Sequence, residues 1–468
     1  MSGRHSFRRV LSKYYPLLAI IIGVILVSLI MGPYQTLDTE LEYNTTRGVL
    51  RWGYPYLDRF GEPHQDSYGD LFNMPPLGFY TQALFFRIFG QALENGIVLI
   101  TLFGIASVVM VYKLGKELYS EATALFAAAL FGLAPWQLVL TRAFLIDAQC
   151  LFLSLLYLYV GVLAIRKNSI KLAAVSGVFF AAALLTKQYA VFMLIPLLLL
   201  YVYHRPKKPK MVPSQVVAFS LPMVFSSLLW YQIILGKELF YLFNHNDFKD
   251  INFPEVVPSY SFMSTFLVDY GLGIFFVVTF VFSLIVGFCF WKRFQKKSVV
   301  SDLVCLVTIL SILGIVMYLA VNLNLKAPYT SAIKYVYHSL PFFSLATASL
   351  ASKSFSLLKF AKQSVKVTRV VLLSVGITGL VLLVMSLIAD FYAARQLATA
   401  SFLIFRVQPN QDVGYSFHVA EPLSQNDPLL AVQFIGFIIL TSGILWASRH
   451  FTVEAVKSIR AEFKKIAR

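Results

Sequence analysis

The chain has 468 residues, of which 58% are hydrophobic and 13% are charged, with a mean hydropathy of +0.71. In soluble domains roughly a quarter of all residues are charged, so this composition argues against a soluble protein. The net charge of +17 would indicate nucleic acid in a soluble chain. Here Lys and Arg beside membrane spans explain it, and we expect no nucleic-acid partner.

Apolar runs long enough to cross a bilayer recur along the whole chain. They are continuous and helix-length rather than short and alternating, which favours helices over a β-barrel. The first run follows a basic start and lacks a small-x-small cleavage site, which is typical of an uncleaved signal anchor. The expected fold class is therefore an all-α polytopic membrane protein. Its twelve predicted spans are at about 16–33, 95–113, 121–141, 146–165, 170–187, 189–204, 212–234, 270–290, 301–321, 335–352, 370–390 and 429–448.

Charges in the connecting segments are distributed unequally between the two sides of the membrane. The two termini and the connections on their side hold 28 of the 40 Lys and Arg residues, whereas 18 of the 23 acidic residues lie on the other side. By the positive-inside rule, both termini are cytoplasmic. The segment "LDTELEY" after the first span is then extracytoplasmic.

Two modules are expected. Residues 1–235 form a catalytic membrane module with the outer loop 34–94, and residues 236–468 form a C-terminal membrane module with outer loops 235–269 and 391–428. Loops of this length are usually functional or disordered. The outer loop 34–94 contains two predicted amphipathic helices. "ELEYNTTRGVLRWG" stops at Gly53-Tyr54-Pro55, and "PPLGFYTQALFFRIFG" ends at Gly90. Both are expected to lie on the membrane surface.

Ionisable groups at the outer ends of the spans are the most informative residues, because placing one in lipid costs roughly 2.5–3.5 kcal/mol. All of them are expected at one face and depth, beneath the two amphipathic helices. Arg and Lys suit a phosphate, and an ionised Asp suits general-base work on a hydroxyl. They are Asp38 and Glu40 after the first span, Arg142 and Asp147 before the fourth, Lys187 between the fifth and sixth, and Lys334 and Tyr335 at the tenth.

Simpler interpretations of each group stay open at this point. Asp38 would also serve as the N-cap of the helix that follows it. Arg142 and Asp147 would pair with each other in a solvated turn. Lys187 would extend to the interface, and Lys334 would be an interfacial anchor. Glu42, the third acid of the first cluster, is interpreted as a surface charge.

These motifs resemble the GT-C superfamily of polyprenyl-phosphate-sugar-dependent glycosyltransferases, and within it the protein O-mannosyltransferase and aminoarabinose transferase branch. The resemblance is most specific across residues 34–200. The family has an Asp, often Asp-Glu, after the first span, whereas this chain has Asp38-Thr39-Glu40. The other matching motifs are Pro75-Pro76-Leu77, the Arg142 and Asp147 pair, Leu185-Thr186-Lys187, and Lys334-Tyr335 with Pro341.

The resemblance implies a role for each of these residues. Asp38 would be the catalytic base, and Asp147 a second acidic site residue near the donor phosphate or a metal. Glu40 would support the site or contact a metal, which makes a divalent cation a possible cofactor. The lipid phosphate would be bound by Arg142, Lys187, Lys334 and Tyr335.

The leading hypothesis is an inverting glycosyltransferase at the extracytoplasmic face. One carboxylate activates the acceptor hydroxyl, and phosphate departs without a general acid, unlike in glycoside hydrolysis. The expected partners are a polyprenyl-phosphate sugar donor, the bilayer, and a glycan, lipid or protein hydroxyl. The alternative is a lipid-linked sugar flippase or polytopic transporter, although transporter sites usually lie near the membrane midplane.

Overall fold

The computed structural model describes residues 15–26, 28, 37–59, 62–64, 75–204, 212–230, 296–322 and 337–361. Within these residues, four helices are long and apolar enough to cross a membrane: Leu93–Leu118, Asp147–Lys167, Pro213–Trp230 and Ser298–Ile315. The prediction of a helical, polytopic membrane protein is thereby confirmed. The predicted spans 270–290, 370–390 and 429–448 and the outer loops 235–269 and 391–428 lie outside the described residues, so the number of twelve stays a prediction.

The elements follow one another in a single series of helices, with one small β-hairpin after the second. The strands of the hairpin are antiparallel, with Leu57 opposite His64. The elements are the helix Tyr15–Leu26, α2 (Leu37–Trp52), β1 (Leu57–Arg59), β2 (Glu62–His64), α3 (Leu77–Phe89), α4 (Leu93–Leu118), α5 (Glu121–Gly132), α6 (Pro135–Leu140), α7 (Asp147–Lys167), α8 (Ile170–Thr186), the 3₁₀ helix η1 (Gln188–Met193), α9 (Leu194–His204), α10 (Val212–Ser227), α14 (Lys296–Asn322), the 3₁₀ turn η5 (Tyr337–Ser339) and α16 (Leu340–Ala361).

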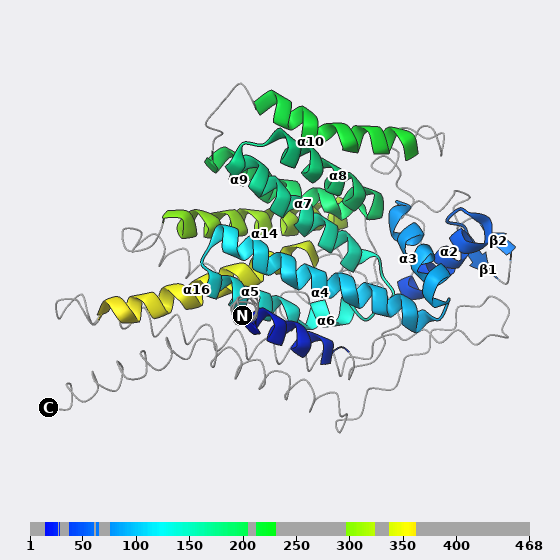
Figure 1. Ribbon diagram of the computed structural model, residues 1–468, viewed down its shortest axis with the longest axis horizontal. Helices are drawn as coiled ribbons and strands as arrows, with labels where there is room; N and C mark the ends of the chain where they lie inside the picture. Colours follow the sequence, from blue (N-terminus) through cyan, green and yellow to red (C-terminus); the bar gives the residue numbers. More distant parts are fainter. Residues whose placement is uncertain are drawn as a thin grey trace, which may run out of the picture.

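The long helices stack side by side, with α10, α8, α7 and α4 in succession and α5 and α16 beyond α4 (Figure 1). Helices α2 and α3 and the hairpin lie together at one end of this stack. Two glycines allow close helix approach. A Cβ at Gly115 of α4 would lie 2.9 Å from Ala124 Cα of α5, and one at Gly177 of α8 would lie 2.1 Å from the Phe219 carbonyl oxygen of α10.

Both helices predicted in the first outer loop are present. Helix α2 ends at Gly53, whose φ of +78° is a conformation that glycine adopts readily, and the Gly53 N–H donates to Val49 O at 2.9 Å. Helix α3 ends in the same way at Gly90, with φ of +96° and a 2.8 Å bond to Phe86 O. Their position on a membrane surface stays a prediction.

Three predicted spans differ in detail from the structure. The span 121–141 is two helices, α5 and α6, because Pro135 cannot continue a helix and instead begins a new one. The span 189–204 begins as the 3₁₀ helix η1. Helix α16 extends to Ala361, nine residues past the predicted end of that span at 352. Lys353, expected in a cytoplasmic segment, is therefore helical, and its side chain is buried.

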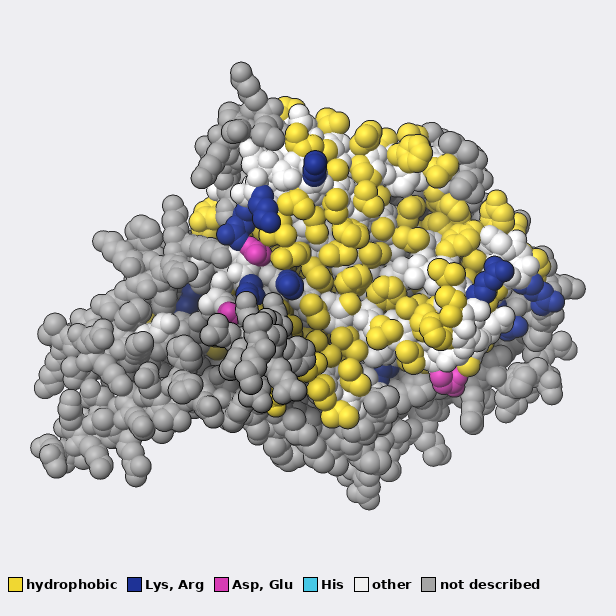
Figure 2. All heavy atoms as spheres, viewed as in Figure 1, with side chains coloured by type: hydrophobic (Ala, Val, Ile, Leu, Met, Phe, Trp, Pro, Cys, Tyr) yellow, Lys and Arg dark blue, Asp and Glu magenta, His cyan; other side chains and the backbone are white. Residues whose placement is uncertain are grey.

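Exposed apolar side chains cover the middle of the described surface, and Lys and Arg side chains gather on either side of this band (Figure 2). The exposed set includes Leu84 and Ile88 of α3, Leu102 of α4 and Val178 of α8. Large apolar surfaces of this kind are disfavoured in water. A lipid environment for the band follows from the same hydropathy that identifies the spans.

Candidate active site

Helices α2 and α3 pack directly over the connection between α6 and α7. Val49 of α2, Phe79 and Ala83 of α3 and Ile146 of the connection form one buried apolar cluster. Gly78 makes this contact possible, because a Cβ there would lie 2.6 Å from Ile146 Cγ2. The Ile146 side chain is therefore held between the two helices.

A second, aromatic cluster extends the same contact towards α4. Tyr43 of α2 makes edge contacts with Phe86 of α3 and Phe144 of the connection, at centroid distances of 5.8 and 5.7 Å. Phe86 and Phe144 stack at 5.5 Å. A Cβ at Gly96 of α4 would lie 2.0 Å from Phe144 Cε2, so glycine is needed there. The residues that lead into α7 are thus enclosed by α2, α3 and α4.

Two tyrosines fasten the ends of α2 and α3. The Tyr43 hydroxyl donates to Gln91 O and the Tyr80 hydroxyl to Gly53 O, both at 2.8 Å. Burial raises the pKa of both phenols above the ordinary value near 10, although Arg47 opposes the rise at Tyr43. Both groups are therefore protonated donors at neutral pH.

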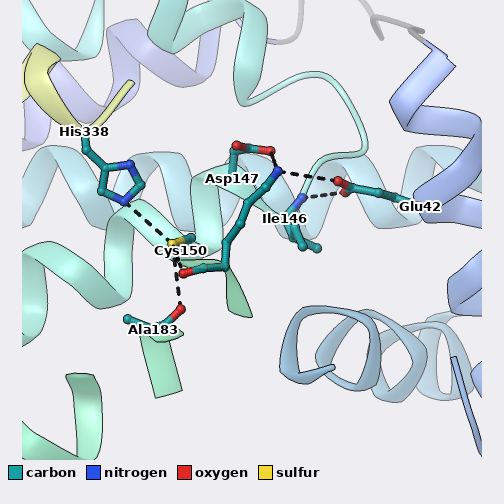
Figure 3. Close-up of polar contacts among 7 residues, drawn as sticks. Glu42, Ile146, Asp147, Cys150, Ala183 and His338 are labelled. Atoms are coloured by element: carbon teal, nitrogen blue, oxygen red, sulfur yellow. Dashed lines mark hydrogen bonds and ion pairs between the residues drawn. The ribbon is translucent and has the colours of Figure 1, made fainter. Parts of the chain in front are cut away.

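Three charged side chains meet beneath α2 (Figure 3). Lys187 Nζ donates to Asp147 Oδ2 at 2.7 Å and lies 3.9 Å from Glu42 Oε1. The side chains of Glu42 and Asp147 are at most 1% exposed, and that of Lys187 is 6% exposed. Burial on this scale is tolerated when opposite charges are paired. We refer to Glu42, Asp147 and Lys187 as the acid–lysine cluster.

Glu42 has a further bond that ties α2 to the start of α7. Its Oε2 accepts the Ile146 N–H at 2.7 Å. Ile146 is the N-cap residue of α7 and provides no side-chain cap of its own. A carboxylate near a helix N-terminus is favoured by the helix dipole. The prediction that Glu42 is a surface charge was wrong, because the helix that carries it is packed against the α6–α7 connection rather than facing water.

Lys187 is positioned by a break between two helices. Its backbone is extended, with φ of −162° and ψ of 145°, between the end of α8 and η1. The predicted boundary between the fifth and sixth spans at this residue is confirmed. The alternative in which Lys187 extends to the interface was wrong, since its ammonium is buried and paired with Asp147.

Arg142 is also buried, at 1% exposure, on the connection that precedes α7. Its Nε donates to Leu138 O at 2.9 Å, one turn back on α6. Both Arg142 and Asp147 are inaccessible to water, so the interpretation of a solvated turn was wrong. The structure places Arg142 five residues before Asp147 in the same enclosed segment.

A buried thiol and imidazole continue the site towards α16. Cys150, one turn after Asp147, lies 3.5 Å from the Lys187 carbonyl oxygen through Sγ and 3.6 Å from His338 Nε2 (Figure 3). His338 also lies 3.4 Å from Ser154 Oγ. Next to it, the Tyr337 hydroxyl donates to Gln137 Oε1 of α6. The turn η5 therefore joins the site from a distant part of the sequence, close to the predicted Lys334 and Tyr335, although the sequence analysis did not single out Tyr337 or His338.

The remaining predicted site residues are only partly described. Asp38 and Glu40 lie on α2, but their side chains are outside what the structure describes, as are Lys334 and Tyr335 entirely. The structure brings Asp147 and Lys187 together, while their chemical roles stay predictions. Glu42 was missed, although one signal was available. Its separation of four residues from Asp38 puts the two on one face of a helix.

Divalent cations prefer clusters of carboxylate oxygens. In the described part of the chain, no group of three or more His, Cys, Asp or Glu residues could hold a metal ion. In the acid–lysine cluster, the Lys187 ammonium lies between the two carboxylates, where a cation would otherwise lie. The described residues therefore do not fit a resident metal, and the possible divalent cofactor stays a prediction.

Residues 73–230 match the family model described as dolichyl-phosphate-mannose-protein mannosyltransferase. The matched segment runs from just before α3 to the end of the α10 region and contains Arg142, Asp147 and Lys187. It confirms, for this third of the chain, the resemblance to the polyprenyl-phosphate-sugar-dependent glycosyltransferases that the motifs indicated. A sequence search of curated proteins gave no match.

Among solved structures, the chain is similar to ArnT from Cupriavidus metallidurans bound to undecaprenyl phosphate, with 13% identity, a TM-score of 0.49, and coverage of 91% of this chain and 88% of that one. The Archaeoglobus fulgidus oligosaccharyltransferase has 13% identity, a TM-score of 0.46 and coverage of 89% and 61%. EmbB from Mycobacterium smegmatis has 10% identity, a TM-score of 0.49 and coverage of 93% and 41%. At such scores these likenesses establish no property of this chain, which spans 61% of the archaeal enzyme.

Proposed function

We propose that this protein is a membrane glycosyltransferase that moves a sugar from a polyprenyl monophosphate to a hydroxyl acceptor at the extracytoplasmic face. The match of residues 73–230 to a mannosyltransferase family supports the class of reaction. The observation that carries the proposal is the acid–lysine cluster within and beside that segment. It joins α2, which bears Asp38, to the start of α7 and the end of α8.

In the proposed reaction, Asp38 takes the proton of the acceptor hydroxyl as the oxygen attacks the anomeric carbon of the sugar. The bond from that carbon to the phosphate oxygen breaks, and its electron pair leaves with the lipid phosphate. Attack opposite the leaving group inverts the anomeric configuration. A phosphate is a good leaving group, so one carboxylate suffices, in contrast to the two that glycoside hydrolysis needs.

Cations near the leaving group stabilise the charge that develops on it. Arg142, Lys187, Lys334 and Tyr335 are the proposed contacts of the lipid phosphate. Arg142 offers a planar guanidinium that suits a phosphate in two-point contact, and Lys187 offers a point charge. Asp147 fixes the Lys187 ammonium at 2.7 Å and thereby sets where that charge lies.

The remaining parts of the proposal concern the setting of the reaction. Both termini are cytoplasmic and the acceptor approaches from the opposite side, as the charge distribution predicts. Residues 1–235 carry the chemistry, and residues 236–468 form the second membrane module. The acceptor hydroxyl belongs to a glycan, a lipid or a protein.

The test is Asp38→Asn in cells that otherwise lack the protein, with lipid-linked sugars and glycoconjugates measured by mass spectrometry. Loss of a general base lowers a rate by about 10²–10⁴-fold, so polyprenyl-phosphate sugar should accumulate and one glycan residue should disappear. Glu94→Gln is the matched control, because it makes the same carboxylate-to-amide change at an exposed position of α4. Its products should equal those of the wild type.

Two results would contradict the proposal. Wild-type turnover in Asp38→Asn would remove the base assignment. Movement of a labelled lipid-linked sugar across liposomes that contain the purified protein, without a new covalent product, would favour a flippase instead.

A further inference from the structure

The least expected charged group in the site is Glu42. A carboxylate in the middle of a surface helix is usually solvated, yet this one is 1% exposed and contacts two segments far away in the chain. Its two oxygens face different partners. Oε2 accepts the Ile146 N–H at 2.7 Å, and Oε1 lies 3.9 Å from Lys187 Nζ.

The hydrogen bond between Ile146 and Glu42 lies at the N-terminus of α7. The amides of a helix N-terminus lack partners within the helix, and a capping side chain from the preceding residue usually supplies one. Ile146 supplies no such side chain, and its own N–H instead donates to Glu42 of another helix. The residue that follows is Asp147, so the bond fixes the main chain directly beside the Asp147 carboxylate.

The Ile146 side chain is fixed by the same helices. It packs against Val49 of α2 and Phe79 of α3, and it lies over Gly78. The backbone of Ile146 is therefore held by a charge-assisted hydrogen bond, and its side chain by apolar packing. Together these contacts determine the distance between α2 and the N-terminus of α7.

Asp38 lies on the same helix, four residues before Glu42. In an α-helix this spacing puts both residues on one face, about one turn apart. A contact that fixes Glu42 consequently fixes the part of α2 from which Asp38 projects.

We infer that Glu42 is a positioning residue that sets the catalytic base on α2 at a fixed distance from the Asp147–Lys187 pair at the start of α7. The inference rests on the proposed function for its catalytic consequence. Glu42 acts through α2 and the Ile146 amide rather than by contact with substrate. Its loss should affect the chemical step, since a misplacement of about 1 Å costs on the order of 10²-fold in rate.

Two substitutions weaken the contact in different ways. Glu42→Gln keeps the volume, but it replaces the charge-assisted hydrogen bond from the Ile146 N–H with a weaker neutral one and removes the charge beside Lys187. Glu42→Asp keeps the charge and withdraws the carboxylate by one methylene, so it cannot span both partners. We expect kcat to fall about 10-fold to 100-fold in each, with KM for the lipid-linked sugar within about twofold of the wild type.

The purified variants should be compared with Thr46→Val, the matched control. Thr46 is also buried on α2, where its hydroxyl lies 2.8 Å from Gln82 Oε1 of α3 and 2.8 Å from the main-chain oxygen of Glu42, and among the described residues it makes no hydrogen bond to α7. Hydrogen exchange measured by mass spectrometry should be faster in the peptide 143–150 of Glu42→Gln than in that of the wild type. In Thr46→Val this peptide should exchange as in the wild type.

A double-mutant comparison tests whether Glu42 acts through Asp38. In the Asp38→Asn background, adding Glu42→Gln should lower the residual rate by less than about twofold, because residues that act as one unit are not additive. A purely structural role would lower the rate by the same factor in both backgrounds.

Each outcome decides one part of the inference. Wild-type kcat in Glu42→Gln and Glu42→Asp, or equal factors in both backgrounds, would overturn it. Unchanged exchange in the peptide 143–150 would show that Glu42 does not fasten α7. If the wild type transfers no sugar, the proposed function fails and the catalytic consequence with it, whereas the exchange experiment still decides whether Glu42 fastens α2 to α7.

Discussion

Two buried ion clusters lie at opposite ends of α4, a helix about 39 Å long. The acid–lysine cluster lies near its N-terminal end, where α2, α3 and the α6–α7 connection meet. At the other end, beside Tyr119, Lys353 of α16 pairs with Asp302 of α14. Both clusters are withdrawn from water, yet they are organised differently.

In the cluster of Asp302, Lys353 and Tyr119, both oxygens of the carboxylate have hydrogen-bond donors. One oxygen of its carboxylate accepts from Lys353 and the other from the Tyr119 hydroxyl, at 2.8 Å. The neighbouring Ser301 hydroxyl donates to Leu118 O at 2.9 Å. One acid and one base, supported by neutral donors, join three helices. Such an arrangement is suited to holding helices together, because both carboxylate oxygens already accept hydrogen bonds.

The acid–lysine cluster is less completely hydrogen-bonded. Two carboxylates share one ammonium, and Asp147 Oδ1 has no hydrogen-bond partner among the residues that the structure describes. A buried acceptor without a donor costs free energy unless a ligand supplies one. Two of its members lie at helix ends, since Asp147 begins α7 and Lys187 follows the end of α8, whereas Glu42 lies within α2. This difference is consistent with the proposal that the acid–lysine cluster binds a ligand, while the Asp302–Lys353 pair at the other end of α4 packs helices together.

The largest effect is expected from Lys187→Met. Removing the ammonium leaves Glu42 and Asp147 buried without their shared cation, which should destabilise the protein by about 3–5 kcal/mol. Transfer should fall by about 10²-fold or more, because a cation near the leaving phosphate is lost. Thermal unfolding in detergent and product formation measure the two effects.

The triple variant Glu42→Gln/Asp147→Asn/Lys187→Met separates these effects. It removes all three charges together, so much of the lost stability should return while transfer stays absent. Recovery of transfer in this variant would show that the acid–lysine cluster is structural, like the Asp302 pair.

A comparable but purely structural effect is expected at the other cluster. Lys353→Met should destabilise by about 3–5 kcal/mol, since it leaves the Asp302 carboxylate buried without its cation. Asp302→Asn/Lys353→Met should regain most of the stability, and its transfer rate should match that of the wild type. The unfolding midpoint and the rate per folded molecule check this. A rate well below that of the wild type in the stable double variant would remove the distinction between the clusters.

The sequence predicted the helices well because their signal is local. Hydropathy identified the described spans, and glycines after α2 and α3 marked their ends at Gly53 and Gly90. The sequence-based prediction placed Lys353 in a cytoplasmic segment, because a lysine after an apolar run is usually solvated. The partner that makes burial tolerable, Asp302, is on another helix 51 residues away, and no local pattern reveals such a pairing.

The same reason explains which site residues were found. Asp147 and Lys187 stood out because charges at the ends of apolar helices are costly. Glu42 stood out less, because it follows two other acids in a polar helix whose exposure looked ordinary. Its partner Ile146 lies 104 residues away and contributes only a backbone amide, which leaves no trace in the amino-acid sequence.

The smallest effects are expected from a pair of glycine substitutions. Gly78→Ala would bring a Cβ to 2.6 Å from Ile146 Cγ2, so Ile146 must shift, at a cost of about 1–3 kcal/mol. Gly314→Ala on α14 meets no atom within 4 Å and should stabilise that helix by about 0.5–1 kcal/mol. Unfolding midpoints in detergent measure both changes. Because Ile146 adjoins Asp147, Gly78→Ala should also lower the transfer rate, whereas Gly314→Ala should leave it unchanged. Equal rates in the two variants would mean that the packing around Ile146 does not control the geometry of the acid–lysine cluster.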